Sequence, residues 1–363
     1  MKPRSSGSGV ASYCRAIFGL SADSLLETDL TSSVIPADSS AVLSKAPVQP
    51  ATLPLVAIFG PTASGKSSLA VAIAERLGGE VIACDSTQVY RGFDIGTAKP
   101  SAAERREIRH HMIDLVSAAE VFTAGEYRQH ALEVLADLRY RHRLPIFTVG
   151  TGLYFRALME GLADAPTRSE RLRARLDATA TKRGGAHLHK ILRRLDPIAA
   201  QRIPVNDRQK LVRALEVCLL AGRPLTELHR EGRRGLQGYA ALKIGLNPPR
   251  QALYERIEKR VHLMLDHGWS EEVAAMLAEG ALQNARAFEF IGYRELRTHL
   301  ETCESLSNTV EAIAQATRRY AKRQLTWFRS ESGVQWFAGF GDAPETLSAA
   351  LDYLEPLLTQ SQK

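Results

Sequence analysis

The sequence predicts an α/β protein in which a parallel sheet is flanked by helices and carries an all-helical, basic insertion domain. Three observations lead to this fold class. The apolar run LPLVAIF leads directly into the glycine-rich stretch GPTASGKS and then into a helical pattern. Two further strand-like runs, EVIACDS and RLPIFTVG, alternate with helical stretches, which is typical of a parallel sheet covered on both faces. Between residues 167 and 236, apolar residues recur only at helical spacing.

The order of these patterns along the chain predicts the domain organisation. Residues 1–53 are rich in serine and contain only two aromatic residues, so we expect a disordered N-terminal extension. A discontinuous catalytic core is expected at 54–166 and 237–345, interrupted by the insertion at 167–236 and followed by a C-terminal tail at 346–363. Within the second part of the core, the sheet resumes at 240–247, and long helices follow at 250–279 and 310–329.

Charge is concentrated in the insertion. The chain has a formal net charge of +7, and residues 167–236 hold 17 Lys plus Arg against 7 Asp plus Glu, a local net charge of +10. The rest of the chain is therefore net −3. A basic region of this kind favours a polyanionic partner.

Other compositional features exclude several classes of protein. The four cysteines lie far apart with no CxxC pair, which argues against a zinc site or a disulfide framework and suits the cytoplasm. The apolar runs are strand-sized, so no membrane association is expected. We expect a monomer. The pair His110 and His111 has no third metal ligand in view and is interpreted as structural or pocket-lining.

Residues 60–67 match the phosphate-binding pattern G-x-x-x-x-G-K-[ST], between a strand and a helix. This context predicts a P-loop NTPase-like core. Backbone N–H groups of the loop and the helix N-terminus bind phosphate oxygens, Lys66 adds a cation, and the Ser67 hydroxyl is the expected ligand of Mg²⁺, the predicted cofactor.

Asp85 is the acid that the sequence puts at the end of a strand. Kinases and nucleotide hydrolases usually carry a Mg²⁺-binding Asp after another strand, but RLPIFTVG ends without an acid. Asp85 can hold Mg²⁺ through water, act as a general base, or cap a turn. Local sequence leaves all three roles open.

Several blocks in order carry a more specific signal. They are GPTASGKS, DSTQVYRGFDIGTAKPS, HHMID, GTGLYFRAL, NDRQKLVRALEV, IGYRE and KRQLTWFR. From about residue 54 to 337, the chain resembles the tRNA dimethylallyltransferases, also called tRNA isopentenyltransferases. No Cys/His zinc-finger pattern follows these blocks, so the resemblance is to the bacterial type.

The resemblance implies transfer of a dimethylallyl group from dimethylallyl diphosphate to N6 of the adenosine just 3′ of a tRNA anticodon. It implies that Asp85 is the general base, with Thr151 and Lys66 as further catalytic residues. The residues expected to bind diphosphate are Gly60, Pro61, Thr62, Ala63, Ser64, Gly65, Lys66, Ser67, Arg256 and Arg260. The two arginines lie four apart on one helix face, where solvated side chains are the alternative interpretation.

By resemblance, the tRNA anticodon stem-loop contacts four groups of residues. The adenosine and its neighbours are read by Ser86, Thr87 and Gln88, and Gln88 suits a bidentate contact to an adenine edge. Asp85 and Thr151 also belong to the implied tRNA contacts, and Thr151 orients the amine or the diphosphate by a hydrogen bond. Further contacts are implied for Arg173, Gln209, Lys210, Leu211, Val212, Arg213, Glu289, Phe290, Ile291, Gly292, Tyr293, Arg294, Lys322, Arg323, Gln324, Leu325, Thr326, Trp327, Phe328 and Arg329. Trp327 either stacks on a base or packs in the core.

Two positions depart from the family pattern. Val149 stands where a glycine is usual, which affects how closely the backbone approaches there, and Lys210 replaces a common arginine. Three other interpretations remain open: a P-loop small-molecule kinase, an enzyme that prenylates free adenine nucleotides, and a catalytically inert RNA-binding protein. The DSTQ segment and the basic insertion favour the tRNA enzyme over the kinase, KRQLTWFR favours RNA over free nucleotides, and the intact Lys66 and Asp85 argue against an inert protein.

Overall fold

The computed structural model describes residues 52–232, 234–278, 286–302 and 304–360. The N-terminal extension expected at 1–53 therefore lies outside the described residues, apart from its last two positions. The described chain divides into two compact units. The sheet unit consists of residues 52–161 and 235–360, and the helical unit is Leu162–Arg234.

The sheet unit is built on six parallel strands, which confirms the predicted fold class. They are β1 (Leu53–Phe59), β2 (Gly79–Cys84), β3 (His110–His111), β4 (Leu144–Val149), β5 (Tyr239–Leu246) and β6 (Val334–Phe337). Their spatial order is β3-β2-β4-β1-β5-β6, and every pairing is parallel. Strands β3 and β6 were not predicted from the sequence, because two and four residues are too short to show a pattern of alternation.

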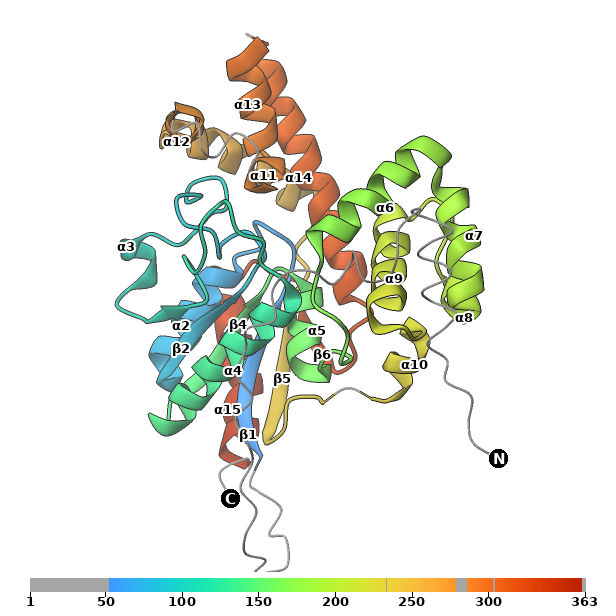
Figure 1. Cartoon of the computed structure of the whole chain (residues 1–363). Coiled ribbons are helices and arrows are strands. Elements are labelled where there is room, and N and C mark those ends of the chain that lie inside the picture. The colour runs from blue at the N-terminus through green and yellow to red at the C-terminus, as the bar shows by residue number, and fades with distance from the viewer. Residues whose placement is uncertain (1–51, 233, 279–285, 303, 361–363) are drawn as a thin grey trace, which may run out of the picture. The chain divides into compact units, whose positions relative to one another are not determined.

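Strand register brings three chain segments together at one edge of the sheet. Val149 ends β4 and pairs both with the last residue of β1 and with the last residue of β2. The residues that follow these strands, Gly60, Asp85 and Gly150, therefore leave the sheet as neighbours at its carboxyl edge. Figure 1 shows this edge at the upper end of the strands.

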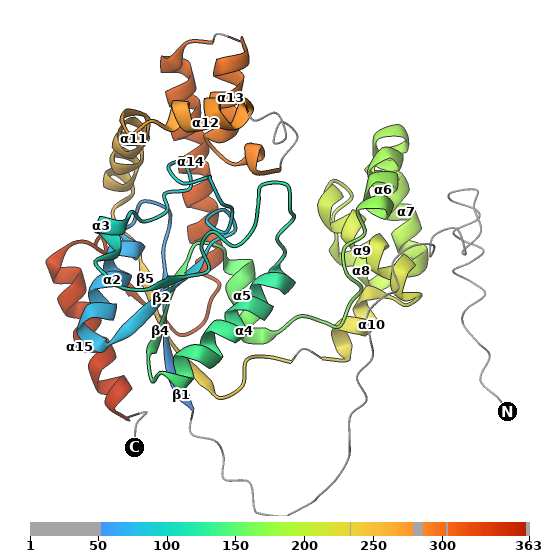
Figure 2. The ribbon, with the colours of Figure 1, turned by 60° about the vertical axis from the view of Figure 1, so that its left-hand side comes forward.

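Helices cover both faces of the sheet. Helices α2 (Lys66–Leu77) and α15 (Pro344–Gln360) lie on one face, and α4 (Ala124–Tyr140) and α5 (Gly152–Glu160) lie on the other (Figures 1 and 2). The C-terminal tail expected at 346–363 is corrected by the structure, because residues 346–360 belong to α15. Ala350 and Leu354, one helical turn apart, are fully buried in the same hydrophobic cluster as α2.

Further helices stand beyond the carboxyl edge of the sheet (Figure 1). They are α11 (Arg250–Asp266), α12 (Trp269–Ala278), the short 3₁₀ helix η2 (Arg286–Glu289), α13 (Tyr293–Thr302) and α14 (Leu306–Phe328). The helical stretch expected at 250–279 is thus two helices. The break falls at Gly268, whose φ of +92° is incompatible with a continuing right-handed helix. The short helix α3 (Ala102–Arg105) lies in the long connection from β2 to β3.

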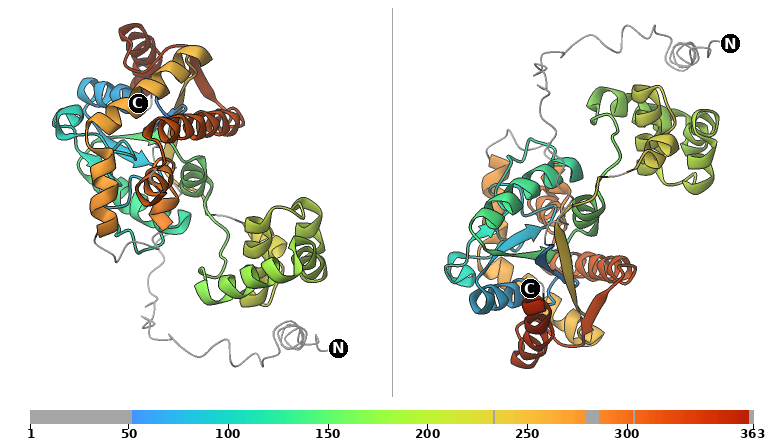
Figure 3. Two further views of the ribbon diagram at one scale, coloured as in Figure 1. Left: turned by 90° about the horizontal axis from the view of Figure 1, so that it is seen from above. Right: turned by 90° about the horizontal axis from the view of Figure 1, so that it is seen from below.

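The helical unit has its own hydrophobic core. Its helices are α6 (Glu170–Arg183), α7 (Gly185–Leu195), α8 (Pro197–Arg202), α9 (Arg208–Ala221) and α10 (Leu225–Arg230). Leu176, Leu188, Leu192 and Leu215 are almost completely buried between them. Figure 3 shows these helices, coloured green to yellow, as one bundle in both views. Most of its charged residues lie on the outer surface, whereas Asp196 and Glu216 are completely buried.

Candidate functional site

The phosphate loop connects β1 to α2 and already has the form of an anion cradle. The Nζ atom of Lys66 donates to the carbonyl oxygens of Gly60 and Pro61 at 2.8 and 2.9 Å. The pKa of Lys66 is lowered to about 8, chiefly by burial; Asp85 opposes this shift and the nearby cation Arg260 adds to it. The Ser64 hydroxyl is buried without a hydrogen-bond partner among the described residues. The loop therefore offers a weakly solvated ammonium group and an unused hydroxyl.

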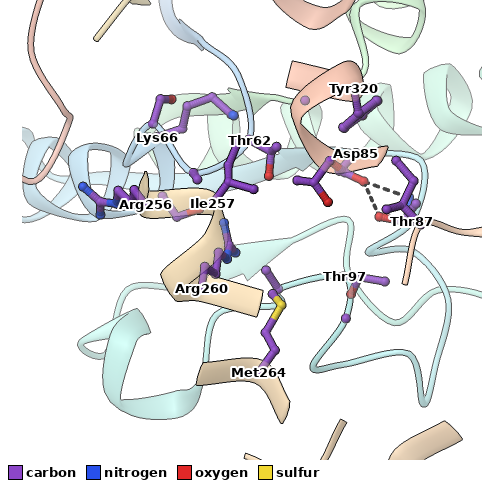
Figure 4. A pocket seen from close by; sticks show the side chains of 18 of the residues that line it. Thr62, Lys66, Asp85, Thr87, Thr97, Arg256, Ile257, Arg260, Met264 and Tyr320 are labelled. Carbon is purple, nitrogen blue, oxygen red and sulfur yellow. Dashed lines mark hydrogen bonds between the residues drawn. The ribbon is translucent and has the colours of Figure 1, made fainter. Parts of the chain in front are cut away.

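Asp85 follows β2 and lies beside this loop. Its Oδ1 atom accepts hydrogen bonds from the backbone N–H and the hydroxyl of Thr87, at 2.8 and 2.7 Å (Figure 4). Its Oδ2 atom lies against Gly150, where an added Cβ atom would come within 2.4 Å of it. The carboxylate is therefore held by one oxygen, and a side chain at position 150 would displace the other from its present position.

The departure at Val149 does not disturb this arrangement. Val149 is fully buried and packs in the hydrophobic cluster on the α4 and α5 side of the sheet. Gly150 is the position that approaches Asp85, and glycine is retained there. The usual glycine at the Val149 position is not needed for this contact.

Thr151 is tied to the segment that follows Asp85. Its Oγ1 atom accepts from the backbone N–H of Ser86 at 3.0 Å and donates to the Ser86 hydroxyl at 3.2 Å. The Nε2 group of Gln88 donates to the carbonyl oxygens of Thr97 and Ala98, at 3.2 and 3.1 Å. The amide nitrogen expected to bind an adenine edge is thus already bonded to the loop at 97–98. A bidentate contact with adenine would require these two hydrogen bonds to break.

The two arginines expected to bind diphosphate differ in their surroundings. Arg260 projects into the pocket toward the phosphate loop (Figure 4), and burial lowers its pKa without removing its charge. Arg256 lies one turn earlier on α11 and makes two hydrogen bonds to Asp342, at 2.7 and 2.9 Å, with its guanidinium over the Phe340 ring. Arg260 is therefore available to an anion, whereas Arg256 is already paired.

Most of these groups, although not Thr151, line one pocket of about 1100 Å³. The phosphate loop, Arg260 and Asp85 supply its polar wall. A more apolar wall comes from α11, α12 and the segment at 289–291, and includes Val261, Met264, Trp269 and Ile291. Figure 4 shows Lys66, Arg260 and Met264 in this order away from the loop. The pocket can therefore hold a charged group at one end and an apolar group at the other.

The residues expected to contact tRNA differ widely in exposure. Nine are exposed: Gln209, Lys210, Glu289, Arg294, Lys322, Arg323, Thr326, Trp327 and Arg329. The side chains of Leu211, Val212, Tyr293 and Phe328 are at most 3% exposed, and Gly292 is buried too. Hydrophobic packing occupies these four side chains, so a contact of these residues with RNA stays a prediction for which only their backbone is available. Phe290, Ile291 and Leu325 are half-buried.

Two arginines of the helical unit have structural partners. Arg173 donates twice to Glu216, at 3.0 Å each, and Arg213 donates to the same carboxylate at 2.6 Å. Glu216 is completely buried, and its pKa is lowered because these hydrogen bonds outweigh desolvation. Removing either arginine would leave a buried charge under-compensated, so their first role is to hold the bundle together.

Sequence reasoning missed two residues next to the site. Tyr320 lines the pocket one turn before Gln324 on α14, and Asp342 contacts Gly65 of the phosphate loop. Neither belongs to a recognisable motif. Helical spacing from Gln324 offered the only signal for Tyr320, and nothing local distinguishes Asp342.

The described residues contain neither a cluster of metal ligands nor a membrane-spanning helix. No group of three or more His, Cys, Asp or Glu residues there is arranged to hold a metal ion. No helix there has both the length and the hydropathy of a membrane span.

Comparisons with known proteins identify the family to which this chain is similar. The family model described as IPP transferase matches residues 88–331. A tRNA dimethylallyltransferase from Solibacter usitatus is 48% identical over 308 residues, which cover 85% of this chain and 100% of the relative. A second tRNA dimethylallyltransferase, from Koribacter versatilis, is 46% identical over 301 residues, 83% of this chain and 98% of the relative.

Solved structures are similar as well. A tRNA isopentenylpyrophosphate transferase from Bacillus halodurans matches with a TM-score of 0.63 and 35% identity, over 85% of this chain and 97% of that chain. A eukaryotic dimethylallyltransferase acting on tRNA matches with a TM-score of 0.73 over 85% of this chain and 80% of that chain, and at 23% identity it supports the fold alone. The family resemblance found in the sequence motifs is confirmed.

Proposed function

The chain belongs to the IPP transferase family, and on that premise we propose that it transfers a dimethylallyl group from dimethylallyl diphosphate to tRNA. The acceptor is the N6 atom of the adenosine on the 3′ side of the anticodon. The observation that carries this proposal is the shared pocket. It joins a phosphate cradle to a strand-end carboxylate and an apolar wall, as alkyl transfer from a diphosphate requires.

The polar end of the pocket suits the leaving group. During transfer, the bond between C1 of the dimethylallyl group and the diphosphate oxygen breaks, and negative charge accumulates on the diphosphate. Lys66, Arg260 and the loop N–H groups lie where they stabilise this charge, which is the form of electrostatic catalysis that buried sites favour. The unpartnered Ser64 hydroxyl supplies one more donor.

Asp85 suits the acceptor side. The N6 lone pair forms the new bond to C1, and the N6 proton must leave. The Oδ1 atom of Asp85 is engaged by Thr87, so Oδ2 is the oxygen that we propose accepts this proton. A positioned general base typically contributes about 10²–10⁴-fold to the rate. Because the pocket lies within a folded edge of the sheet, the adenosine must leave its stack to reach it.

The proposed Mg²⁺ ion fits the residues present. Ser67 is exposed at the start of α2, and both Ser67 and Asp85 line the pocket. Mg²⁺ is commonly held by few protein ligands together with waters and phosphate oxygens, so a cluster of three acids is not required. When bound, the ion would neutralise part of the diphosphate charge.

We propose that exposed residues near the pocket contact the RNA. Trp327 is 39% exposed, and the Arg156 guanidinium lies 4.8 Å from its ring centroid. An added Cβ atom on Gly152 would touch the indole, so the ring lies beside Thr151. Its position supports stacking on a nucleotide next to the adenosine, while Lys322, Arg323 and Arg329 contact phosphates.

The decisive experiment is incubation with dimethylallyl diphosphate, Mg²⁺ and unmodified tRNA, followed by digestion and detection of N6-dimethylallyladenosine. We expect product with tRNA and none with free AMP. Phosphorylation of a small molecule from ATP without any prenylated nucleoside would support the kinase interpretation instead.

The Asp85→Asn variant tests the proposed base. We expect turnover to fall by at least about 100-fold, because the amide cannot accept the N6 proton. The affinity for tRNA, measured by filter binding, should stay close to that of the unaltered protein. Equal loss of turnover and of binding would make Asp85 a residue that positions the RNA.

A further inference from the structure

The side chain of Gln324 forms hydrogen bonds to two different loops beside the pocket, the phosphate loop and the turn after β4. It lies near the C-terminal end of α14 and is 6% exposed. Its Oε1 atom accepts from the backbone N–H of Thr62 at 2.7 Å, and its Nε2 group donates to the carbonyl oxygen of Gly150 at 2.8 Å. One partner is a donor and the other an acceptor, so only one orientation of the amide satisfies both.

The two partners belong to different parts of the proposed reaction. Thr62 is the third residue of the phosphate loop, which we propose binds the donor. Gly150 contacts the Oδ2 atom of Asp85, and its own N–H donates to the Cys84 carbonyl at 3.0 Å. The amide thus joins the loop that holds the leaving group to the strand end that supports the base.

This arrangement differs from the role that the sequence suggested. The KRQLTWFR motif implies that Gln324 contacts tRNA, but both ends of its amide are bound to backbone within the sheet unit. The neighbouring Lys322 and Arg323 are exposed on the same helix and are free to face RNA.

We propose that Gln324 is a positioning residue that sets the separation between the diphosphate cradle and Asp85. The inference rests on the proposed transfer reaction. In that reaction C1 of the donor must meet N6 of the acceptor, and misplacement by about 1 Å costs on the order of 100-fold in rate. Gln324 touches neither reacting atom and acts through Thr62 and Gly150.

The Gln324→Met variant removes both hydrogen bonds and keeps a side chain of similar size. We expect kcat at saturating donor and tRNA to fall by about 100-fold, while the Kd for tRNA changes little. The matched control is Gln315→Met, which alters an exposed glutamine on the same helix and should leave kcat unchanged. A rise in the Kd for tRNA with an unchanged kcat would overturn the proposal and restore an RNA contact.

The Gln324→Glu variant guards against a result that reflects misfolding. Its protonated carboxyl group has one acceptor and one donor, which is the pattern that Thr62 and Gly150 require. Its ionised form instead sets an oxygen against the Gly150 carbonyl. We therefore expect the ratio of its kcat to that of the unaltered protein to rise as the pH is lowered. A ratio independent of pH would contradict the proposal.

Failure of this inference is distinguishable from failure of the proposed function. If the unaltered protein forms no N6-dimethylallyladenosine, the function is wrong. If it does so and the Gln324→Met variant keeps its kcat, the function stands and the positioning role is wrong.

Discussion

Asp85 presents only one oxygen to the pocket, because Thr87 holds the other through two hydrogen bonds. The Oδ2 atom of Asp85 occupies the space that a side chain at position 150 would fill, and the residue there is glycine. The strand-end position was visible in the sequence. The sequence did not distinguish among a metal ligand, a base and a turn cap, because these roles depend on which oxygens of Asp85 are already hydrogen-bonded.

Lys66 is a residue of the phosphate loop whose charge changes with pH just above neutrality. Its pKa is lowered to about 8 by burial, so the ammonium form predominates below that pH and is lost above it. We expect the affinity for inorganic pyrophosphate to weaken as the pH rises from 7 to 9.5, measured by calorimetry.

The control for this prediction is the Lys66→Arg variant, whose guanidinium stays charged over the whole range. It should bind pyrophosphate with much less dependence on pH. A similar loss of affinity in both proteins would assign the titration to another group.

The connection after β6 packs against the phosphate loop, a contact that the sequence did not predict. The N–H of Gly341 donates to the Ser64 carbonyl at 2.9 Å, and the Asp342 carboxylate lies over Gly65. Hydrogen bonding to Arg256 lowers the pKa of Asp342, so this carboxylate is ionised at neutral pH. A negative charge therefore stands beside the cradle and occupies one of its two expected arginines.

We predict that Asp342→Asn strengthens the binding of inorganic pyrophosphate by about 10-fold, because one repulsive charge is removed and Arg256 is released. The free energy of unfolding should change by less than about 1 kcal/mol, since both partners of the ion pair are partly exposed. Calorimetric titration measures the first quantity and urea denaturation the second.

Asp352→Asn is the matched control, because it removes an exposed carboxylate from α15 outside the pocket lining. It should leave pyrophosphate binding unchanged. Weaker binding by the Asp342→Asn variant would mean that the ion pair supports the shape of the phosphate loop.

At the scale of the whole molecule, the pocket and most of the excess positive charge belong to different units. The pocket belongs to the sheet unit, whereas the segment with a net charge of +10 lies almost entirely in the helical unit. Lys190, Arg193 and Arg194 occupy one face of α7 at helical spacing and are exposed. No ion pair is found for these three cations within the described ranges.

We predict that reversing these three charges to glutamate weakens tRNA binding and makes it less dependent on salt. Each lost phosphate contact should reduce the slope of log Kd against log salt concentration by about 0.9. Filter binding between about 50 and 200 mM KCl measures this slope.

The control reverses three exposed arginines of the sheet unit, Arg76, Arg109 and Arg139, which do not line the pocket. The slope should stay that of the unaltered protein. If both variants lose the same salt dependence, net charge and not the α7 face governs binding.

The sequence by itself determined the parallel sheet, the phosphate loop, the basic helical insertion and the family. These features rest on local patterns: apolar runs of strand length, glycine spacing before Lys66, and helical periodicity from 167 to 236. They can be read along the chain because each arises from neighbouring residues. The N-terminal extension, the bound Mg²⁺ and the monomeric state stay predictions.

Only the tertiary structure decided which motif residues face the pocket and which support it. Gln324 and Thr62 are hydrogen-bonded across 262 positions of sequence, and Arg256 meets Asp342 across 86. Leu211 and Phe328 lie in motifs associated with RNA but are buried by packing. A motif preserves the types of residues, whereas contacts between distant segments decide the burial and the partners of each side chain.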